Sequence, residues 1–141
     1  VFSGLGNGTI DYVNKKFSDY TGLASEELKG ENWIKVIHPD DKKRVLVKWT
    51  ESILNKEVYL AEARMLSKDG TYRWHKSMAN PLIDKEGNVI KWYGSFTDIH
   101  DLKEIEEQLT KANKQLKRIN ADLDNFVYTA SHDLKSPITN I

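Results

Sequence analysis

The sequence predicts an α+β protein in which a five-stranded antiparallel sheet, with short helices on one face, precedes a long C-terminal coiled-coil helix. Two observations carry this prediction. Residues 1–99 contain short β-rich runs separated by turn signals, whereas residues 102–130 repeat apolar side chains in steps of three and four. The change of period marks a change from a half-buried sheet to a helix that needs a partner.

The strands are predicted from alternating runs and from the turns between them. Residues 9–13 alternate apolar and polar side chains directly after Asn7-Gly8, a dipeptide that favours a tight hairpin. Three further β-rich runs are separated by short turns that contain glycine, and they cover residues 59–67, 72–83 and 89–97. Short connections of this kind join antiparallel neighbours, so we expect the last three strands to pair in sequence order.

Two helices are predicted between the first two strands and the last three. Ser25 is a good N-cap for a short helix that ends at Gly30. Asp40 or Asp41 is expected to cap a longer helix, because a carboxylate at a helix start accepts free backbone N–H groups. That helix has apolar side chains at helical spacing, namely Val45, Trp49 and Ile53.

The C-terminal segment has the pattern of a coiled coil. Nine positions form an unbroken a/d seam: Leu102, Ile105, Leu109, Ala112, Leu116, Ile119, Leu123, Phe126 and Ala130. A lone helix would leave so narrow an apolar stripe in water, so we expect a parallel homodimer through residues 102–130. The alternative is that the stripe packs back on the sheet of its own chain.

Composition excludes several classes of function. Lys and Arg number 21, as do Asp and Glu, so no net charge draws the chain to nucleic acid or to a membrane surface. The absence of cysteine excludes disulfides, thiolate metal sites and cysteine nucleophiles. No apolar run approaches the roughly 20 residues that span a bilayer. We expect a cytoplasmic location and, because the chain opens without Met and stops within its apolar repeat, a longer parent protein.

The sharpest chemical signal lies near the C-terminus, where Ser131, His132 and Asp133 follow the coiled coil and Pro137 comes five residues after the histidine. A neutral imidazole is a competent nucleophile toward a phosphoryl group. An adjacent carboxylate can orient the ring, accept its proton and stabilise the cation that forms. Taken alone, an exposed histidine beside an aspartate is more often incidental.

Other candidate sites are less distinctive. Helix capping explains His38 and the two aspartates that follow Pro39, so no metal site is predicted. Aromatic and apolar side chains between sheet and helices either line a small-molecule pocket or fill it, and the candidates are Trp33, Trp49, Met65 and Trp74. The sequence leaves the ligand of such a pocket unknown.

The string from Ser131 to Pro137, at the end of a heptad helix, resembles the phosphoacceptor box of the histidine kinase dimerisation domain. The resemblance implies that His132 is the autophosphorylation site and Asp133 the acid or base beside it. Ser136 stands where many members have Thr or Asn, and a role in dephosphorylating the partner is implied for it. Pro137 corresponds to the proline that bends the helix.

Residues 1–99 resemble a PAS domain that ends in a PAC motif. The matching segments, in order, are residues 10–14, 20–22, 36–41, 68–74 and 94–99. The resemblance implies a sensor sheet that passes a change of state through residues 97–99 into the outgoing helix. Asp98-Ile99 is usually followed by Thr in this family, and His100 takes that place here. Flavin photosensors of this fold need a reactive cysteine, which the chain lacks.

Together the two resemblances predict the sensory and linker fragment of a two-component sensor histidine kinase, with a PAS domain (1–99), a signalling helix (100–130) and the start of the phosphoacceptor domain (131–141). No ATP-binding box occurs, so ATP and magnesium belong to a missing kinase domain, and the fragment alone should be inactive. The expected partners are a second copy and the receiver domain of a response regulator. The alternatives are a non-enzymatic ligand-binding or dimerisation module and a PAS domain with another output, such as a nucleotide cyclase.

Overall fold

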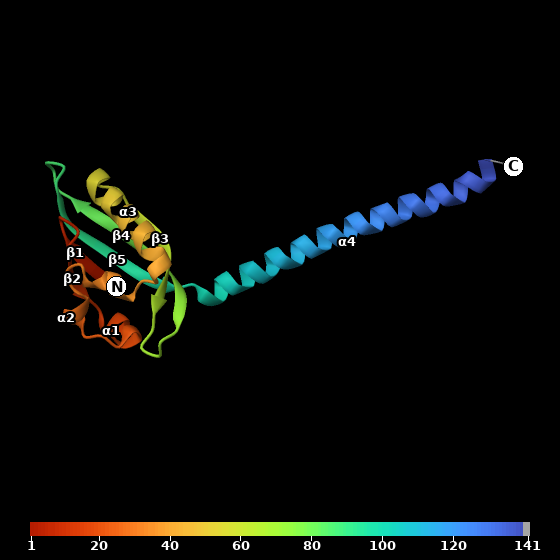
Figure 1. Cartoon of the computed structure of the whole chain (residues 1–141). Coiled ribbons are helices and arrows are strands. Elements are labelled where there is room, and N and C mark those ends of the chain that lie inside the picture. The colour runs from red at the N-terminus through yellow and green to blue at the C-terminus, as the bar shows by residue number, and fades with distance from the viewer. Residues whose placement is uncertain (140–141) are drawn as a thin grey trace. The chain divides into compact units, whose positions relative to one another are not determined.

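The computed structural model describes residues 1–139, with side chains through Lys135. The described residues fall into two compact units, the first covering residues 1–101 and the second beginning at Leu102 (Figure 1). The first unit holds the sheet and the shorter helices, and the second consists of a single helix.

One antiparallel sheet organises the first unit. Its strands run in the order β2 (Ile10–Val13), β1 (Phe2–Leu5), β5 (Val89–Asp98), β4 (Tyr72–Ile83) and β3 (Tyr59–Leu66). The hairpins β3–β4 and β4–β5 pair in sequence order, as predicted. The pairing of β1 with β5 is a long-range contact that joins the two ends of the domain. The predicted fold class is confirmed.

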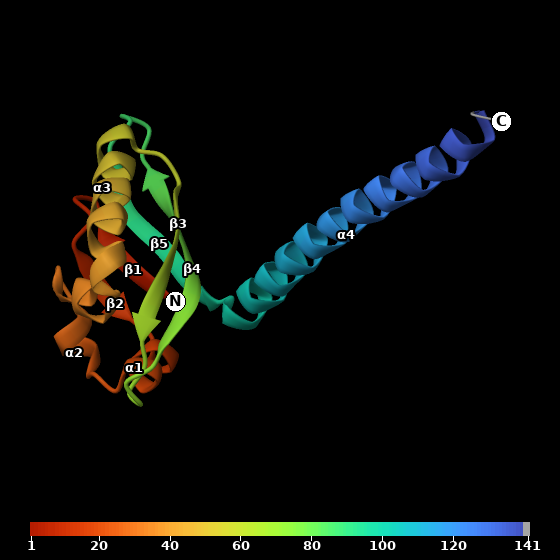
Figure 2. The ribbon, with the colours of Figure 1, turned by 45° about the vertical axis from the view of Figure 1, so that its right-hand side comes forward.

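The helices α1 (Lys15–Thr21), α2 (Ser25–Leu28) and α3 (Pro39–Asn55), with the 3₁₀ helix η1 (Asn32–Val36), connect β2 to β3, and α3 runs along one face of the sheet (Figure 2). Apolar side chains from both layers form one core. Its most deeply buried large side chains are Trp92, Leu28, Met65 and Val45. Burial of large apolar side chains is the main stabilising term in such a domain.

The helix starts differ from those predicted. The N-cap of α2 is Ala24, whose backbone N–H donates to the Glu27 carboxylate at 2.9 Å, and Ser25 is already helical. The N-cap of α3 is His38, whose Nδ1 accepts the Asp40 backbone N–H at 3.1 Å. Pro at the first helical position explains this shift, because its fixed φ suits the helix and makes the preceding residue the cap. Asp41 has another partner, described below.

Alternation along β4 decides which residues enter the core. His75, Ser77 and Ala79 are buried, whereas the residues between them are more exposed. Trp74 therefore lies on the opposite face from these three side chains, since successive side chains of a strand point to opposite faces.

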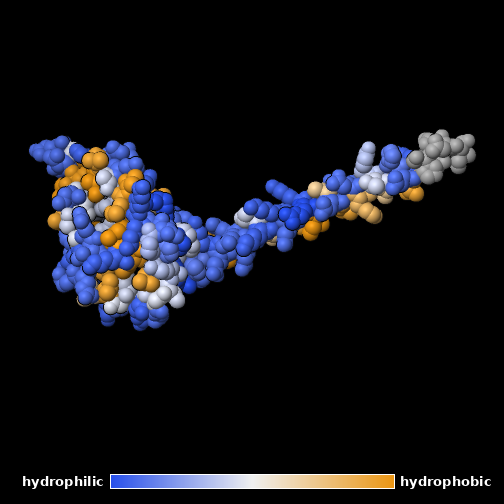
Figure 3. Space-filling model, viewed as in Figure 1, coloured by the Kyte–Doolittle hydropathy of each residue, from blue (hydrophilic) through white to orange (hydrophobic). Residues whose placement is uncertain are grey.

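Helix α4 (His100–Thr139) begins at the end of the first unit and makes up the described part of the second. It stays α-helical through His132 and as far as Thr139. Its apolar stripe is exposed in the single chain: the large seam residues, from Leu102 to Phe126, are between 54% and 69% exposed. Figure 3 shows apolar side chains recurring along the helix between polar ones. Within residues 1–139, none of the helices combines the length and apolar character needed to cross a membrane.

Candidate functional site

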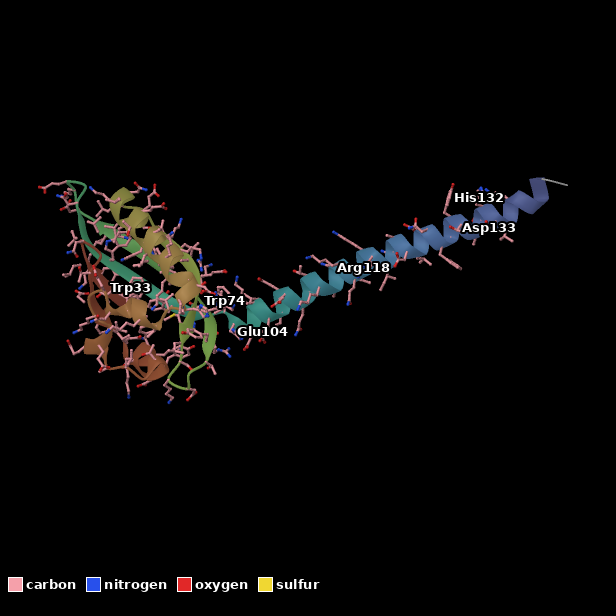
Figure 4. All side chains as sticks on the ribbon, viewed as in Figure 1. Trp33, Trp74, Glu104, Arg118, His132 and Asp133 are labelled. Atoms are coloured by element: carbon pink, nitrogen blue, oxygen red, sulfur yellow. The ribbon has the colours of Figure 1, made fainter. Side chains whose placement is uncertain are left out.

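The predicted phosphoacceptor lies on the surface of α4. The side chains of His132 and Asp133 are 69% and 75% exposed, and Figure 4 shows them near the C-terminal end of the helix. The Nδ1 atom of His132 lies 3.8 Å from Oδ1 of Asp133. One turn earlier, the Tyr128 ring stacks on the imidazole with centroids 6.3 Å apart and planes 27° apart. An i, i+4 pair of this kind is a neighbour on the surface of any helix.

This arrangement suits an exposed nucleophile. With the carboxylate on the Nδ1 side of the ring, Nε2 remains available for attack on an electrophile. The high exposure of His132 allows a separate domain to bring a bulky substrate to it. At 3.8 Å the Asp133 carboxylate lies beyond hydrogen-bond distance of Nδ1 but near enough to stabilise a positive charge on the ring. The side chains of Ser136 and Pro137 lie outside the described residues, so their implied roles stay predictions.

The space between sheet and helices is nearly filled. The cavity there measures about 20 Å³, and eight mostly aromatic residues line it: Phe2, Ile10, Val13, Phe17, Trp33, Trp49, Tyr59 and Phe96. That is room for about one water molecule. The Phe17 and Phe96 rings stack at 4.7 Å, and Trp49 packs edge-on against both Tyr59 and Trp92 at 5.0 Å. Aromatic side chains thus fill most of this cavity.

The four predicted pocket residues do not form one site. Trp33 and Trp49 line the cavity, and Met65 is fully buried without lining it. The prediction for Trp74 is wrong, because β4 turns this side chain to the other face of the sheet. There the Arg64 guanidinium lies 5.1 Å above the Trp74 ring, and Figure 4 shows Trp33 and Trp74 well apart.

Arg64 also joins β3 to the start of α3 through Asp41. The Asp41 carboxylate accepts from the Arg64 backbone N–H at 2.9 Å, from Nε at 3.0 Å and from Nη2 at 2.8 Å. These hydrogen bonds from Arg64 lower the pKa of Asp41 to about 2. The Asp41 side chain is only 6% exposed. The role of Asp41 is therefore structural. It pairs with Arg64 and does not form the cap of α3 that the sequence predicted.

A second ion-pair network lies where β5 ends and α4 begins. The Arg73 Nε atom donates to Asp98 at 2.7 Å, and its Nη2 donates to Asp101, in the first turn of α4, at 3.2 Å. Partial burial alone would raise the pKa of Asp98, but hydrogen bonds from Arg73 and from a backbone N–H lower it. Only Ile99 separates β5 from α4, and its backbone N–H donates to the Trp74 carbonyl at 2.9 Å.

The ion pairs that Arg73 and Arg64 form were not predicted from the sequence. The segment 68–74, which contains Arg73, was used only to identify the fold. The pairing of Arg73 with Asp98 becomes visible only with the register of β4 against β5, in which His75 lies opposite Asp98. Asp41 was predicted as a cap because carboxylates are common there, and its partner Arg64 is 23 residues away.

Comparison with known proteins identifies relatives for most of the chain. Residues 10–96 match the protein family described as PAS fold. The peroxide stress-activated histidine kinase mak1 of Schizosaccharomyces pombe is 34% identical over 152 aligned residues, which cover all of this chain and 9% of that kinase. Blue-light-activated histidine kinase 1 of Erythrobacter litoralis is 32% identical over 114 residues, 81% of this chain and 31% of that protein.

A solved structure gives the same result for the fold. The sensory box histidine kinase/response regulator from Burkholderia thailandensis superposes with a TM-score of 0.63 at 26% identity, covering 83% of this chain and 88% of that one. This chain spans less than a third of either kinase named above. The relatives thus carry large regions that have no counterpart in these 141 residues.

Proposed function

Because the chain belongs to the PAS family, we propose that residues 1–99 are the sensory input of a two-component sensor histidine kinase and that His132 accepts phosphate from ATP. The observation that carries this proposal is an exposed His–Asp pair on the helix that follows directly from the last strand of the sensor sheet. Sensor histidine kinases among the relatives support the same assignment.

The residues of α4 supply a nucleophile and its proton acceptor. In the neutral tautomer with hydrogen on Nδ1, the Nε2 lone pair of His132 attacks the γ-phosphorus of ATP, and the bond from that phosphorus to the bridging oxygen of ADP breaks. The ring then carries a positive charge until the Nδ1 proton leaves, and Asp133 at 3.8 Å stabilises that charge or accepts the proton. A separate kinase domain holds ATP and magnesium and positions the phosphoryl group. The phosphate then passes to an aspartate of a response regulator.

The exposed stripe of α4 supports a homodimer as the working unit. Seam residues that are more than half exposed in the single chain would be buried by a second, parallel copy of the helix. A dimeric helix also provides a two-state element, because a change of rotation or register in the coil alters the surroundings of His132. A cytoplasmic location for this part of the parent protein belongs to the same proposal.

The nearly filled cavity bears on the rival function, a non-enzymatic ligand-binding module. About 20 Å³ leaves no room for a small organic ligand in the core of the domain. The proposal also assigns Ser136 a role in dephosphorylating the regulator, which the family resemblance implies.

The proposal is tested on the full-length parent protein with labelled ATP. Wild-type protein should incorporate acid-labile phosphate, and His132→Gln should lose the label entirely. Asn125→Gln is the matched control, because Asn125 is exposed on the same helix away from the seam and should leave labelling unchanged. Label that survives His132→Gln would refute the site assignment, and absence of label from wild type would favour the non-enzymatic alternative.

A further inference from the structure

We propose that His100 is a proton-binding site that controls how the first turn of α4 is attached to the sheet. The neutral imidazole accepts a backbone hydrogen bond from β4, and protonation removes that acceptor. The coupling between sensor sheet and signalling helix would therefore respond to pH, which goes beyond the phosphotransfer proposed above.

The first observation is the bond itself. The Trp74 backbone N–H donates to Nδ1 of His100 at 3.2 Å. The backbone N–H of His100 in turn donates to Oδ1 of Asp98 at 2.9 Å, so Asp98 caps the start of α4. The Ile99 N–H donates to the Trp74 carbonyl. Both the backbone N–H and the backbone carbonyl of Trp74 therefore hold the junction between β5 and α4.

The second observation is the kind of residue at this position. At position 100 the acceptor is an imidazole nitrogen, Nδ1. A neutral imidazole has one acceptor nitrogen, and an imidazolium ion has none. Histidine is also the side chain that ordinarily changes charge between pH 5 and 8. The hydrogen bond from Trp74 therefore requires the neutral form of the His100 imidazole.

The neighbouring charges favour a rearrangement once His100 binds a proton. On the sheet and α1 the titratable groups around the junction are Arg73, His75, Asp98 and Tyr20. On α4 the titratable residues that follow His100 in the sequence are Asp101, Lys103 and Glu104. Arg73 already pairs with Asp98 and Asp101. A cationic imidazole would compete with Arg73 for those carboxylates, and it would also oppose the positive end of the helix dipole.

The second histidine of this region differs in its surroundings. His75 is buried on the inner face of β4, its ring packs edge-on against Tyr20 at 4.9 Å, and its Nδ1 lies 3.0 Å from the Arg73 carbonyl. Burial lowers the pKa of the His75 imidazole. His75 therefore binds a proton less readily than an ordinary histidine and does not account for a response near neutral pH.

The test uses this chain and measures the Trp74 amide by NMR between pH 5.5 and pH 8. The amide protection factor of Trp74, corrected for intrinsic exchange, should be high at pH 8 and fall by roughly two- to tenfold as the imidazole is protonated, which corresponds to the loss of one hydrogen bond. The Trp74 amide shift should titrate together with the His100 ring signals. This comparison within the wild type does not depend on any variant.

Three variants sharpen the test. His100→Asn keeps an acceptor, the amide Oδ1 in place of Nδ1, that does not titrate, so the Trp74 protection factor should stay high at both pH values. His100→Ala should make it low at both. His38→Gln is the matched control, since His38 uses its Nδ1 in the same way at the start of α3, and the Trp74 response should persist. A pH response that survives in His100→Asn, or a Trp74 amide in the wild type that does not change as His100 is protonated, would overturn the proposal. Both outcomes are independent of whether His132 is phosphorylated.

Discussion

The sheet domain and the helix that follows it differ in what covers their apolar side chains. In residues 1–101 the large apolar side chains meet each other, and Trp92 and Leu28 are completely buried. In α4 the large apolar side chains of the seam stay more than half exposed, with Phe126 at 69%. The domain thus buries its own core, whereas the seam of α4 stays exposed in the single chain, and the proposed dimer would cover it.

The largest effect expected from this difference lies in the core of the domain. Trp92 packs against Trp49, and its Nε1 donates to the Gly6 carbonyl at 3.3 Å. Trp92→Ala should lower the free energy of unfolding by about 3–5 kcal/mol, because it leaves a large cavity. Urea denaturation followed by circular dichroism measures this change. The control Ile90→Ala, at a neighbouring position that is 56% exposed, should change stability by less than about 0.5 kcal/mol.

The seam of α4 should respond through association and leave the domain unchanged. Leu116→Glu places a charge in the apolar seam and should weaken the dimer roughly a hundredfold, while unfolding of the sheet domain stays as in the wild type. Sedimentation equilibrium gives the dimer affinity. Lys117→Glu is the matched control, because it introduces the same side chain one position outside the seam. Equal affinities for the two variants would show that the stripe is not the dimer interface.

The buried ion pair of the domain should make its stability depend on pH in the acid range. The pKa of Asp41 is lowered to about 2, so its contribution is complete above about pH 4 and is lost as the pH falls toward 2. Since one pKa unit corresponds to about 1.4 kcal/mol, this contribution is about 2 kcal/mol. Asp41→Asn should lose that amount at pH 5 and should show a smaller decrease between pH 5 and pH 2.5. Urea denaturation at the two pH values compares the proteins, and parallel decreases would contradict this role.

The smallest effect is expected at an ion pair on the surface of α4. Lys111 and Glu107 lie 3.4 Å apart with side chains about 70% exposed. Glu107→Gln should change helix stability by about 0.3 kcal/mol or less, and added salt should remove the difference. Thermal unfolding at low and high salt measures it. A loss comparable to that of Asp41→Asn would mean that burial does not distinguish the two pairs.

The sequence predicted those features that depend on a repeating pattern or on a local motif. Strand alternation and glycine turns predicted the sheet, and the seam from Leu102 to Ala130 lies on one continuous helix. Features that depend on a contact distant in sequence were missed or wrong. Asp41 was assigned to a cap because Arg64 enters only through the packing of α3 against β3. Trp74 was assigned to the pocket because the sequence does not show how β4 pairs with β3 and β5. That pairing fixes the face of the sheet on which the Trp74 side chain lies.

The candidate site shows the same limit. The residues from Ser131 to Pro137 form a motif that is local to one helix, so the sequence could single it out, and its role stays a prediction. The junction network could not, because Arg73 and Asp101 are 28 residues apart and meet only after β4 and β5 pair. A residue such as His100, which departs from the family pattern, was noticed in the sequence, but its acceptor role required the position of the Trp74 backbone.

The measurement that tests the central claim most directly is the labelling rate of His132 in the full-length parent protein with insertions in α4. A seven-residue insertion after Lys114 keeps the phase of the heptads, and a two-residue insertion breaks it. If the sensor sheet controls His132 through this helix, the seven-residue insertion should keep the wild-type rate, and the two-residue insertion should change it severalfold. Equal labelling rates in all three proteins would contradict control through α4.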